Sequence, residues 1–182
     1  MGTFPRAELE EMMRRWLKAN QDAEAANDWP KHLSPFYTED ALYYWNMGPH
    51  EDFIARGRQQ IHDWALGTEM EGLEGWTYSY EQVLIDEQQG EIVGFWKQIA
   101  PFKRPDGSNY EIAGVGGSWF RYAGNFMWSW QRDFFDVKNM AALFRDLARD
   151  GHLSPGLGAR IARAAKGEAL PGHVKYATRR VG

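Results

Sequence analysis

The strand candidate that decides the fold is FMWSWQRDFFD, residues 126–136. Aromatic residues are frequent in it, as is typical of a strand in a sheet. Three further strand candidates precede it, at residues 76–86, 91–100 and 110–122. The four strand candidates are joined by residues 87–90 (EQQG), 101–109 and 123–125 (AGN). Turn-forming residues in these segments favour antiparallel pairing.

Helix candidates come before these strands. Apolar residues recur at spacings of three and four across residues 7–26, which predicts an amphipathic helix. Shorter helices are expected from Trp29 and over residues 58–64. Between them we expect one short strand at 41–46 and a loop at 47–52, because the loop contains a Gly-Pro pair.

A last helix is expected at residues 140–148, with Asp136 as its N-cap. Helices grouped on one face of an antiparallel sheet define an α+β fold. We predict a cone-shaped barrel, in which a strongly curved antiparallel sheet is roofed by the N-terminal helices. The concavity of such a sheet is where a small molecule would bind.

The length of 182 residues favours one domain, which we place at residues 1–150, followed by a C-terminal extension at 151–182. The extension carries six of the 21 basic residues, Arg179 and Arg180 among them, but one of the 25 acidic residues. It also contains apolar residues such as Leu157. We therefore expect it to be ordered, to pack on the domain or a neighbouring subunit, and to shield the pocket from water.

Composition limits the classes of function. The chain has no cysteine, and its five histidines show no ligand spacing, so we expect neither a metal site nor another cofactor. No run is apolar enough for a membrane span or a signal peptide, which predicts a cytoplasmic protein without a membrane partner. The chain before the extension has a net negative charge, which repels nucleic acid, so we expect no nucleic-acid partner. Aromatic residues reach 15%, so we expect some to line a pocket for a small aromatic substrate.

The order of these elements resembles the nuclear transport factor 2-like superfamily over about residues 7–148. The resemblance rests on Asp40-Ala41, YWNM at residues 44–47, GRQQI at 57–61 and the ending WQRDFFD at 130–136. Enzymes of this superfamily include ketosteroid isomerase, scytalone dehydratase, polyketide cyclases and limonene epoxide hydrolase. The chain is also similar to the aromatic-rich diarylpropane lyases, which deformylate a bis-phenolic diol without a cofactor. The resemblance implies a homo-oligomer, a dimer or a trimer.

Tyr44 and Asn46 are two apart on a predicted strand, so their side chains share one face and could hold one substrate oxygen. A buried tyrosine beside a turn asparagine is the structural alternative. In the epoxide hydrolases that the chain resembles, such a pair holds a water with an aspartate, which matches Asp133. Those enzymes also use an arginine and an aspartate where this chain has Trp96 and Gln98, so the proton shuttle to an epoxide is lacking.

Asp133 lies among aromatic residues, where loss of solvation would raise the pKa of its carboxyl towards a useful acid–base value. The alternative is a salt bridge with Arg132 or with another arginine on the sheet edge. His50 follows a Gly-Pro pair in a loop, where it could take a phenolic proton at the pocket mouth or simply be solvated. Residues expected to contact substrate are Trp45, Trp64, Trp96, Gln98, Trp119, Trp128 and Phe135.

The function we expect is that of a cofactor-independent lyase acting on a bulky phenolic molecule, for example the deformylation of a lignin-derived diarylpropane diol to a stilbene with release of formaldehyde. Tyr44, Asn46, His50 and Asp133 are the catalytic candidates. The alternatives are an epoxide hydrolase, a dehydratase or isomerase, and a non-catalytic binder of small molecules.

Overall fold

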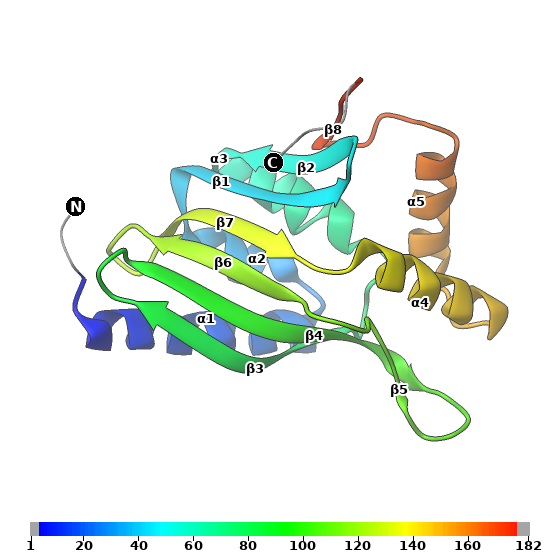
Figure 1. The fold of residues 1–182 in the computed structure, drawn as a ribbon, viewed down its shortest axis with the longest axis horizontal. Helices are drawn as coiled ribbons and strands as arrows, with labels where there is room; N and C mark the ends of the chain where they lie inside the picture. The colour runs from blue at the N-terminus through cyan, green and yellow to red at the C-terminus, as the bar shows by residue number, and fades with distance from the viewer. Residues whose placement is uncertain (1–3, 178–182) are drawn as a thin grey trace.

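The protein folds into a long helix laid across a curved sheet, as a computed structural model that describes residues 4–177 shows (Figure 1). Within these residues eight strands form one sheet in the order β3-β4-β6-β7-β1-β2-β8, with β5 paired to β4. β1 and β7 are parallel, and the other pairs are antiparallel. The strands are β1 (Tyr37–Gly48), β2 (Glu51–Arg56), β3 (Thr77–Asp86), β4 (Glu91–Lys103), β5 (Asn109–Glu111), β6 (Gly117–Tyr122), β7 (Trp128–Phe134) and β8 (His173–Lys175).

The helices cover the concave face and one end of this sheet. α1 (Arg6–Ala26) buries Leu9, Met12 and Trp16 against the strands, and it ends at Asn27, whose left-handed conformation caps its last turn. The shorter helices are α2 (Trp29–Leu33), η1 (Ser34–Phe36), α3 (Gly57–Gln60), η2 (Ile61–Ala65) and η3 (Thr68–Met70), followed near the C-terminus by α4 (Val137–Arg149) and α5 (Pro155–Ala165).

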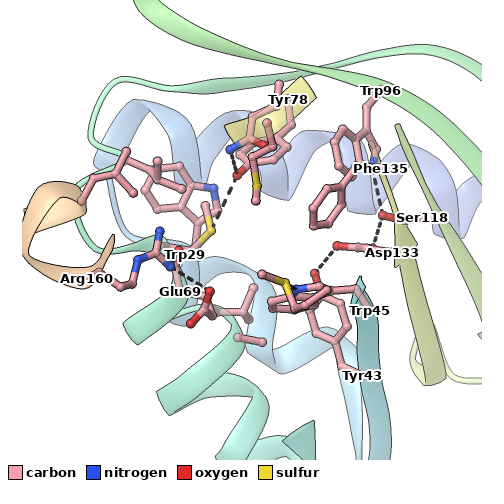
Figure 2. Close-up of a pocket in the computed structure, with 18 of the residues that line it drawn as sticks. Trp29, Tyr43, Trp45, Glu69, Tyr78, Trp96, Ser118, Asp133, Phe135 and Arg160 are labelled. Carbon is pink, nitrogen blue, oxygen red and sulfur yellow. Dashed lines mark hydrogen bonds and ion pairs between the residues drawn. The ribbon is translucent and has the colours of Figure 1, made fainter. Parts of the chain in front are cut away.

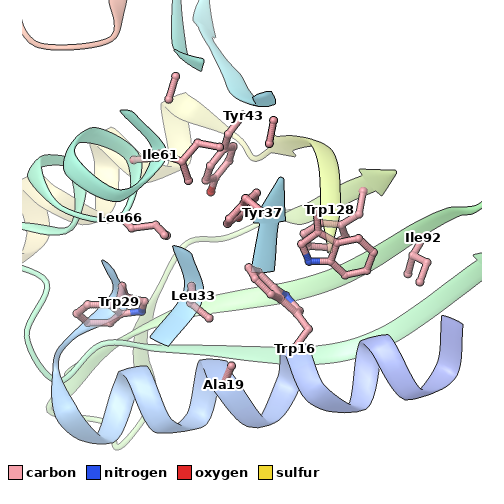
Figure 3. Close-up of a cluster of buried hydrophobic side chains, with 14 of the residues drawn as sticks. Trp16, Ala19, Trp29, Leu33, Tyr37, Tyr43, Ile61, Leu66, Ile92 and Trp128 are labelled. Atoms are coloured by element: carbon pink, nitrogen blue, oxygen red, sulfur yellow. The ribbon is translucent and has the colours of Figure 1, made fainter. Parts of the chain in front are cut away.

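The main core lies between α1 and the sheet. Trp16 of α1 contacts the rings of Tyr37, Phe120 and Trp128 edge-on, and Trp128 also stacks on Phe120 at 4.6 Å between ring centroids (Figure 3). Burying aromatic rings this large supplies much of the stabilisation of a small domain. The core therefore fixes α1 across the sheet and sets the depth of the concavity.

The predicted α+β class and the N-terminal helical roof are confirmed. The sheet does not close into a barrel, however, because β3 and β8 are its two free edges. The predicted strand at 110–122 is two strands, β5 and β6. The chain between them is rich in glycine, and a Cβ on Gly117 would lie 2.4 Å from the ring of Phe134. The predicted loop at 47–52 is also wrong, because its second half starts β2, where Phe53 and Ala55 are buried.

The described part of the C-terminal extension packs against the body of the same chain. Asp136 caps α4 as expected, accepting hydrogen bonds from the backbone of Lys138 and Asn139. Leu157 of α5 is fully buried, and its approach requires Gly72, where a Cβ would lie 2.2 Å from the Leu157 nitrogen. β8 then pairs with the edge strand β2. Arg179 and Arg180 lie outside the described residues.

Candidate active site

A cavity of about 520 Å³ lies between the concave face of the sheet and the helices. Its walls come from α1 and α2, from the inner faces of β1, β4, β6 and β7, and from α4 and α5. Most of the lining is aromatic or aliphatic. Polar groups lie around Asp133 and, on the opposite side, around Glu69 and Arg160 (Figure 2). The Tyr78–Gln98 pair and Arg145 are further polar groups of the lining. The volume is within the range of pockets for drug-sized molecules.

Asp133 of β7 is the centre of the first polar group. Its Oδ2 accepts a hydrogen bond from the Tyr43 hydroxyl at 2.5 Å. Its Oδ1 accepts one from the Ser118 hydroxyl at 2.6 Å and one from the Gln131 amide at 2.8 Å. The side chain is partly buried, and the remainder faces the cavity. The carboxyl is thus held by three neutral donors in one orientation.

A second layer of hydrogen bonds fixes these donors. The Trp96 indole nitrogen donates to the Ser118 hydroxyl at 2.9 Å, which orients the hydroxyl hydrogen towards Asp133. The Tyr37 hydroxyl donates to the Gln131 side-chain oxygen, which leaves the amide N–H₂ directed at Asp133. Such support holds a reacting group within a narrow range of positions.

Burial raises the pKa of Asp133 above its ordinary value, although hydrogen bonds from Gln131, Ser118 and Tyr43 act in the opposite direction. Burial and the neighbouring Asp133 raise the pKa of the Tyr43 hydroxyl well above its usual range, so this group stays a donor. The alternative pairing of Asp133 with Arg132 is wrong, because Arg132 lies on the outer face over the ring of Tyr44. Among the described residues no basic side chain forms an ion pair with Asp133.

The register of β1 against β7 decides which residues face the cavity. β1 runs parallel to β7, with Tyr43 opposite Gln131 and Trp45 opposite Asp133. Side chains at paired positions point to the same face, so Tyr43 and Trp45 share the inner face with Asp133. Trp45 lines the cavity and stacks on Phe53 at 3.8 Å between ring centroids.

The structure therefore places Tyr44 and Asn46 away from the cavity, contrary to our expectation. Tyr44 packs on Trp130 on the outer face. Asn46 is exposed, donating to the Gly48 carbonyl at 2.7 Å and to Asp52 at 2.8 Å, so it organises the β1–β2 turn. His50 is exposed in that turn and does not line the cavity.

The expected substrate contacts divide in the same way. Trp45, Trp96, Gln98 and Phe135 line the cavity. Trp119 is on the outer face, donating to Glu91 at 2.9 Å, and Trp128 is in the core. Trp64, on η2, packs beside the core and is not part of the lining. Sequence reasoning missed Tyr43, Ser118 and Gln131, which only the pairing of β1, β6 and β7 brings together.

The second polar group joins residues of four elements, and the sequence carried no signal for it. Glu69 of η3 pairs with Arg160 of α5 at 2.8 Å between Oε2 and Nη1. His173 of β8 contacts Glu69 Oε1 at 3.1 Å through Nε2 and Glu51 Oε1 at 2.7 Å through Nδ1. Burial lowers the pKa of His173, but the bonds to Glu69 and Glu51 outweigh it, and the pKa is raised. Glu69, Arg160 and His173 all line the cavity.

In residues 4–177 no group of three or more acidic or histidine side chains is placed to hold a metal ion. No helix among these residues has both the length and the apolar character that crossing a membrane requires.

No protein-family model matches the sequence, and no curated protein matches it. Solved structures do match. A protein from Jannaschia sp. CCS1 assigned as a SnoaL-like polyketide cyclase aligns at 14% identity and a TM-score of 0.58, covering 78% of this chain and 96% of that one. PrhC from Penicillium brasilianum NBRC 6234 aligns at 15% identity and a TM-score of 0.58, covering 84% and 97%.

An NTF2-like protein of unknown function from Burkholderia pseudomallei K96243 aligns at 12% identity and a TM-score of 0.54, covering 75% of this chain and 96% of that one. Identities this low carry the architecture and not the activity. The chain therefore has the α+β cone fold of the nuclear transport factor 2-like proteins.

Proposed function

We propose that the protein is a cofactor-independent lyase, in which Asp133 moves protons on a bulky aromatic substrate. One observation carries the proposal. A carboxyl with a raised pKa projects into an apolar cavity and is held by neutral donors alone among the described residues. A raised pKa makes a carboxyl easier to protonate than an ordinary aspartate, which favours a role in general acid–base catalysis.

The substrate class we propose is a diaryl-substituted 1,3-diol with a para-hydroxyl on one ring. In the first step the phenol gives its proton to solvent water and the benzylic C–O bond breaks, with Asp133 giving its own proton to the departing hydroxyl. The products of this step are water and a quinone methide. In the second step Asp133 takes the proton of the neighbouring hydroxymethyl group, the C–C bond breaks, and formaldehyde leaves. The electron pair of that bond forms the stilbene double bond and restores the phenolate.

Tyr43 is the group that tunes this carboxyl. Its hydroxyl donates to Oδ2, the carboxyl oxygen that does not contact Ser118 or Gln131. That hydrogen bond stabilises the carboxylate formed after the first proton transfer. Aromatic walls at Trp45 and Trp96 offer surfaces for the two rings of the substrate.

The test uses purified protein and a panel of such diols, with formaldehyde measured chemically and stilbene by its absorbance. We expect equal amounts of both products, with no added metal or nucleotide. Asp133→Asn should lower the rate about a thousandfold, while Tyr44→Phe on the outer face should leave it unchanged. Absence of formaldehyde across the panel, or full activity in the Asn variant, would refute the lyase.

A second candidate is an intramolecular aldol cyclisation, as in polyketide cyclases. It is favoured by the fold shared with proteins assigned as SnoaL-like polyketide cyclases and by the same buried carboxyl, which could remove a proton from carbon. The two candidates differ in their products. A cyclase releases no formaldehyde, so mass spectrometry of the product mixture separates them.

A further inference from the structure

The cavity has a second polar end, far from Asp133. Glu69, Arg160 and His173 line it, and their side chains are only 14%, 13% and 7% exposed. Glu51 belongs to the same group through His173, although it does not line the cavity. In Figure 2 the Glu69–Arg160 pair and Asp133 lie on opposite sides of the cavity. Aromatic and aliphatic residues such as Trp29 and Met70 line the space around it. A molecule that fills the cavity therefore meets polar groups at both ends.

The charges of this second end balance. Both ring nitrogens of His173 lie within hydrogen-bond distance of a carboxylate, Nδ1 at 2.7 Å from Glu51 and Nε2 at 3.1 Å from Glu69. A neutral imidazole has a single N–H, so both contacts are hydrogen bonds only when the ring is protonated. Two carboxylates then face one imidazolium and one guanidinium, that of Arg160. The set is neutral without a ligand.

Arg160 nevertheless has donors to spare. Its Nη1 serves Glu69 twice, bonding to the backbone oxygen and, at 2.8 Å, to Oε2. Within residues 4–177, Nε and Nη2 of Arg160 have no protein acceptor. A guanidinium carries five N–H groups in a rigid fork. Nε and Nη2 of Arg160 are not among the fully buried atoms without a partner, so a molecule in the cavity that Arg160 lines can reach them. A ligand oxygen would satisfy these groups.

We propose that Arg160 is a specificity-determining residue that donates to an uncharged oxygen, such as a hydroxyl, methoxyl or carbonyl, at the end of the substrate remote from Asp133. This inference rests on the proposed function only for the placement of the reacting end at Asp133. An uncharged oxygen is selected because the second polar end is already neutral. A carboxylate would add an uncompensated charge beside Glu69, inside an apolar cavity. The substrate class is thus an elongated aromatic molecule with an oxygen at each end.

The first experiment leaves the protein unchanged and varies the probe. Calorimetric titration would compare 4,4′-dihydroxystilbene, 4-hydroxystilbene and 4′-hydroxystilbene-4-carboxylate. We expect the second hydroxyl to tighten binding about tenfold, the usual effect of one well-placed hydrogen bond to a charged group. The carboxylate should bind more weakly than the singly hydroxylated probe. Equal affinity of all three probes would overturn the proposal.

The second experiment locates the effect on the protein. In Arg160→Met the gain from the second hydroxyl should disappear. In Arg163→Met, on the same helix but exposed and paired with Glu168, the gain should remain. Arg160→Lys keeps a positive charge beside Glu69 but loses the forked N–H groups of the guanidinium, so most of the affinity gained from the second hydroxyl should be lost. This variant replaces Arg160→Met in the test if the Met variant does not fold. An undiminished gain in the Lys variant would refute the role of Arg160.

Asp133→Asn separates this inference from the proposed function. The variant should lose turnover and still bind the dihydroxylated probe more tightly than the singly hydroxylated one. If wild-type protein releases no formaldehyde but the gain depends on Arg160, the lyase fails and the specificity role stands. If formaldehyde appears and the affinity gained from the second hydroxyl does not depend on Arg160, the lyase stands and the specificity role of Arg160 fails.

Discussion

Both faces of the central sheet carry aromatic side chains, but these side chains have different surroundings on each face. On the concave face Tyr43 and Trp45 line a cavity and hold or flank Asp133. On the convex face Tyr44 and Trp130 pack on one another, with the Arg132 guanidinium over the Tyr44 ring. The chemistry of a residue here follows from its face and not from its type, because neighbours in sequence lie on opposite sides.

The difference also extends to solvation. The convex-face cations lie over rings at the surface, where Arg121 covers Trp130 and also pairs with Glu91 at 2.8 Å. Such pairs are screened by water and contribute little to stability. On the concave face no cation of residues 4–177 pairs with Asp133, and burial raises its pKa. A carboxyl is therefore held by neutral donors on one face of the sheet and is a solvated ion-pair partner on the other.

The largest expected effect compares adjacent residues of β7. Asp133→Asn should lower the rate of the proposed reaction about a thousandfold, since it removes the group that moves the protons. Arg132→Gln, on the opposite face, should stay within about twofold. Steady-state kinetics on the two variants measures the contrast. Similar losses in both variants would show that the faces do not differ in the way described.

The next effect sharpens the comparison on β1. Tyr43→Phe removes the hydrogen bond to Asp133 Oδ2 and should lower the rate about 10- to 100-fold. Because that bond lowers the pKa of Asp133, its loss should also move the acid–base profile of the reaction to higher pH. Tyr44→Phe is the matched control, and both its rate and its pH profile should equal those of the wild type. A shifted profile in the control would contradict the assignment of faces.

A third prediction concerns the convex face itself. We propose that a second copy of the chain covers the partly exposed rings there, because the rings of Trp119 and Trp130 meet at 5.2 Å in an aromatic surface of the kind that oligomers bury. Trp130→Glu should convert the oligomer to a monomer in sedimentation analysis. Asp133→Asn should not change the mass. A monomeric wild-type protein at micromolar concentration would exclude this use of the face.

The fold could be predicted from sequence because strong local patterns fix it. The spacing of Leu9, Met12 and Trp16 defines α1, and the aromatic strands are bounded by turn residues. The face of β1 could not be predicted in the same way. Tyr43, Tyr44 and Trp45 are all large and aromatic, so alternation gives no sign of which parity points inward. The pairing with β7, a contact distant in sequence, decides it.

The two polar ends of the cavity were likewise predictable from the sequence only in part. Asp133 was identified through the resemblance of the closing strand. Its partner Ser118, from the neighbouring strand, was not. Glu69 lies 91 residues from Arg160 and 104 from His173, separations over which no spacing rule operates. The C-terminal extension that supplies Arg160 and His173 could be expected to pack, but its contribution to the cavity wall required the folded chain.

The smallest expected effect is on stability and tests the solvation of Asp133 directly. The folded-state pKa of this carboxyl is raised above its unfolded value, so the folded protein binds the carboxyl proton more tightly than the unfolded chain does. Its contribution to stability is then fully present below the unfolded pKa, about 3.9 for an aspartate, and is lost as the pH rises through the higher folded value. Denaturant unfolding of the wild type and Asp133→Asn at a series of pH values measures this. The wild type should lose stability relative to the Asn variant as the pH rises from about 4. Asn keeps an oxygen for Ser118 and Gln131, so the packing is little changed and the difference reports the charge. A stability difference that does not vary with pH would show that the carboxyl is as well solvated in the cavity as in water, and the contrast between the two faces would then fail at Asp133.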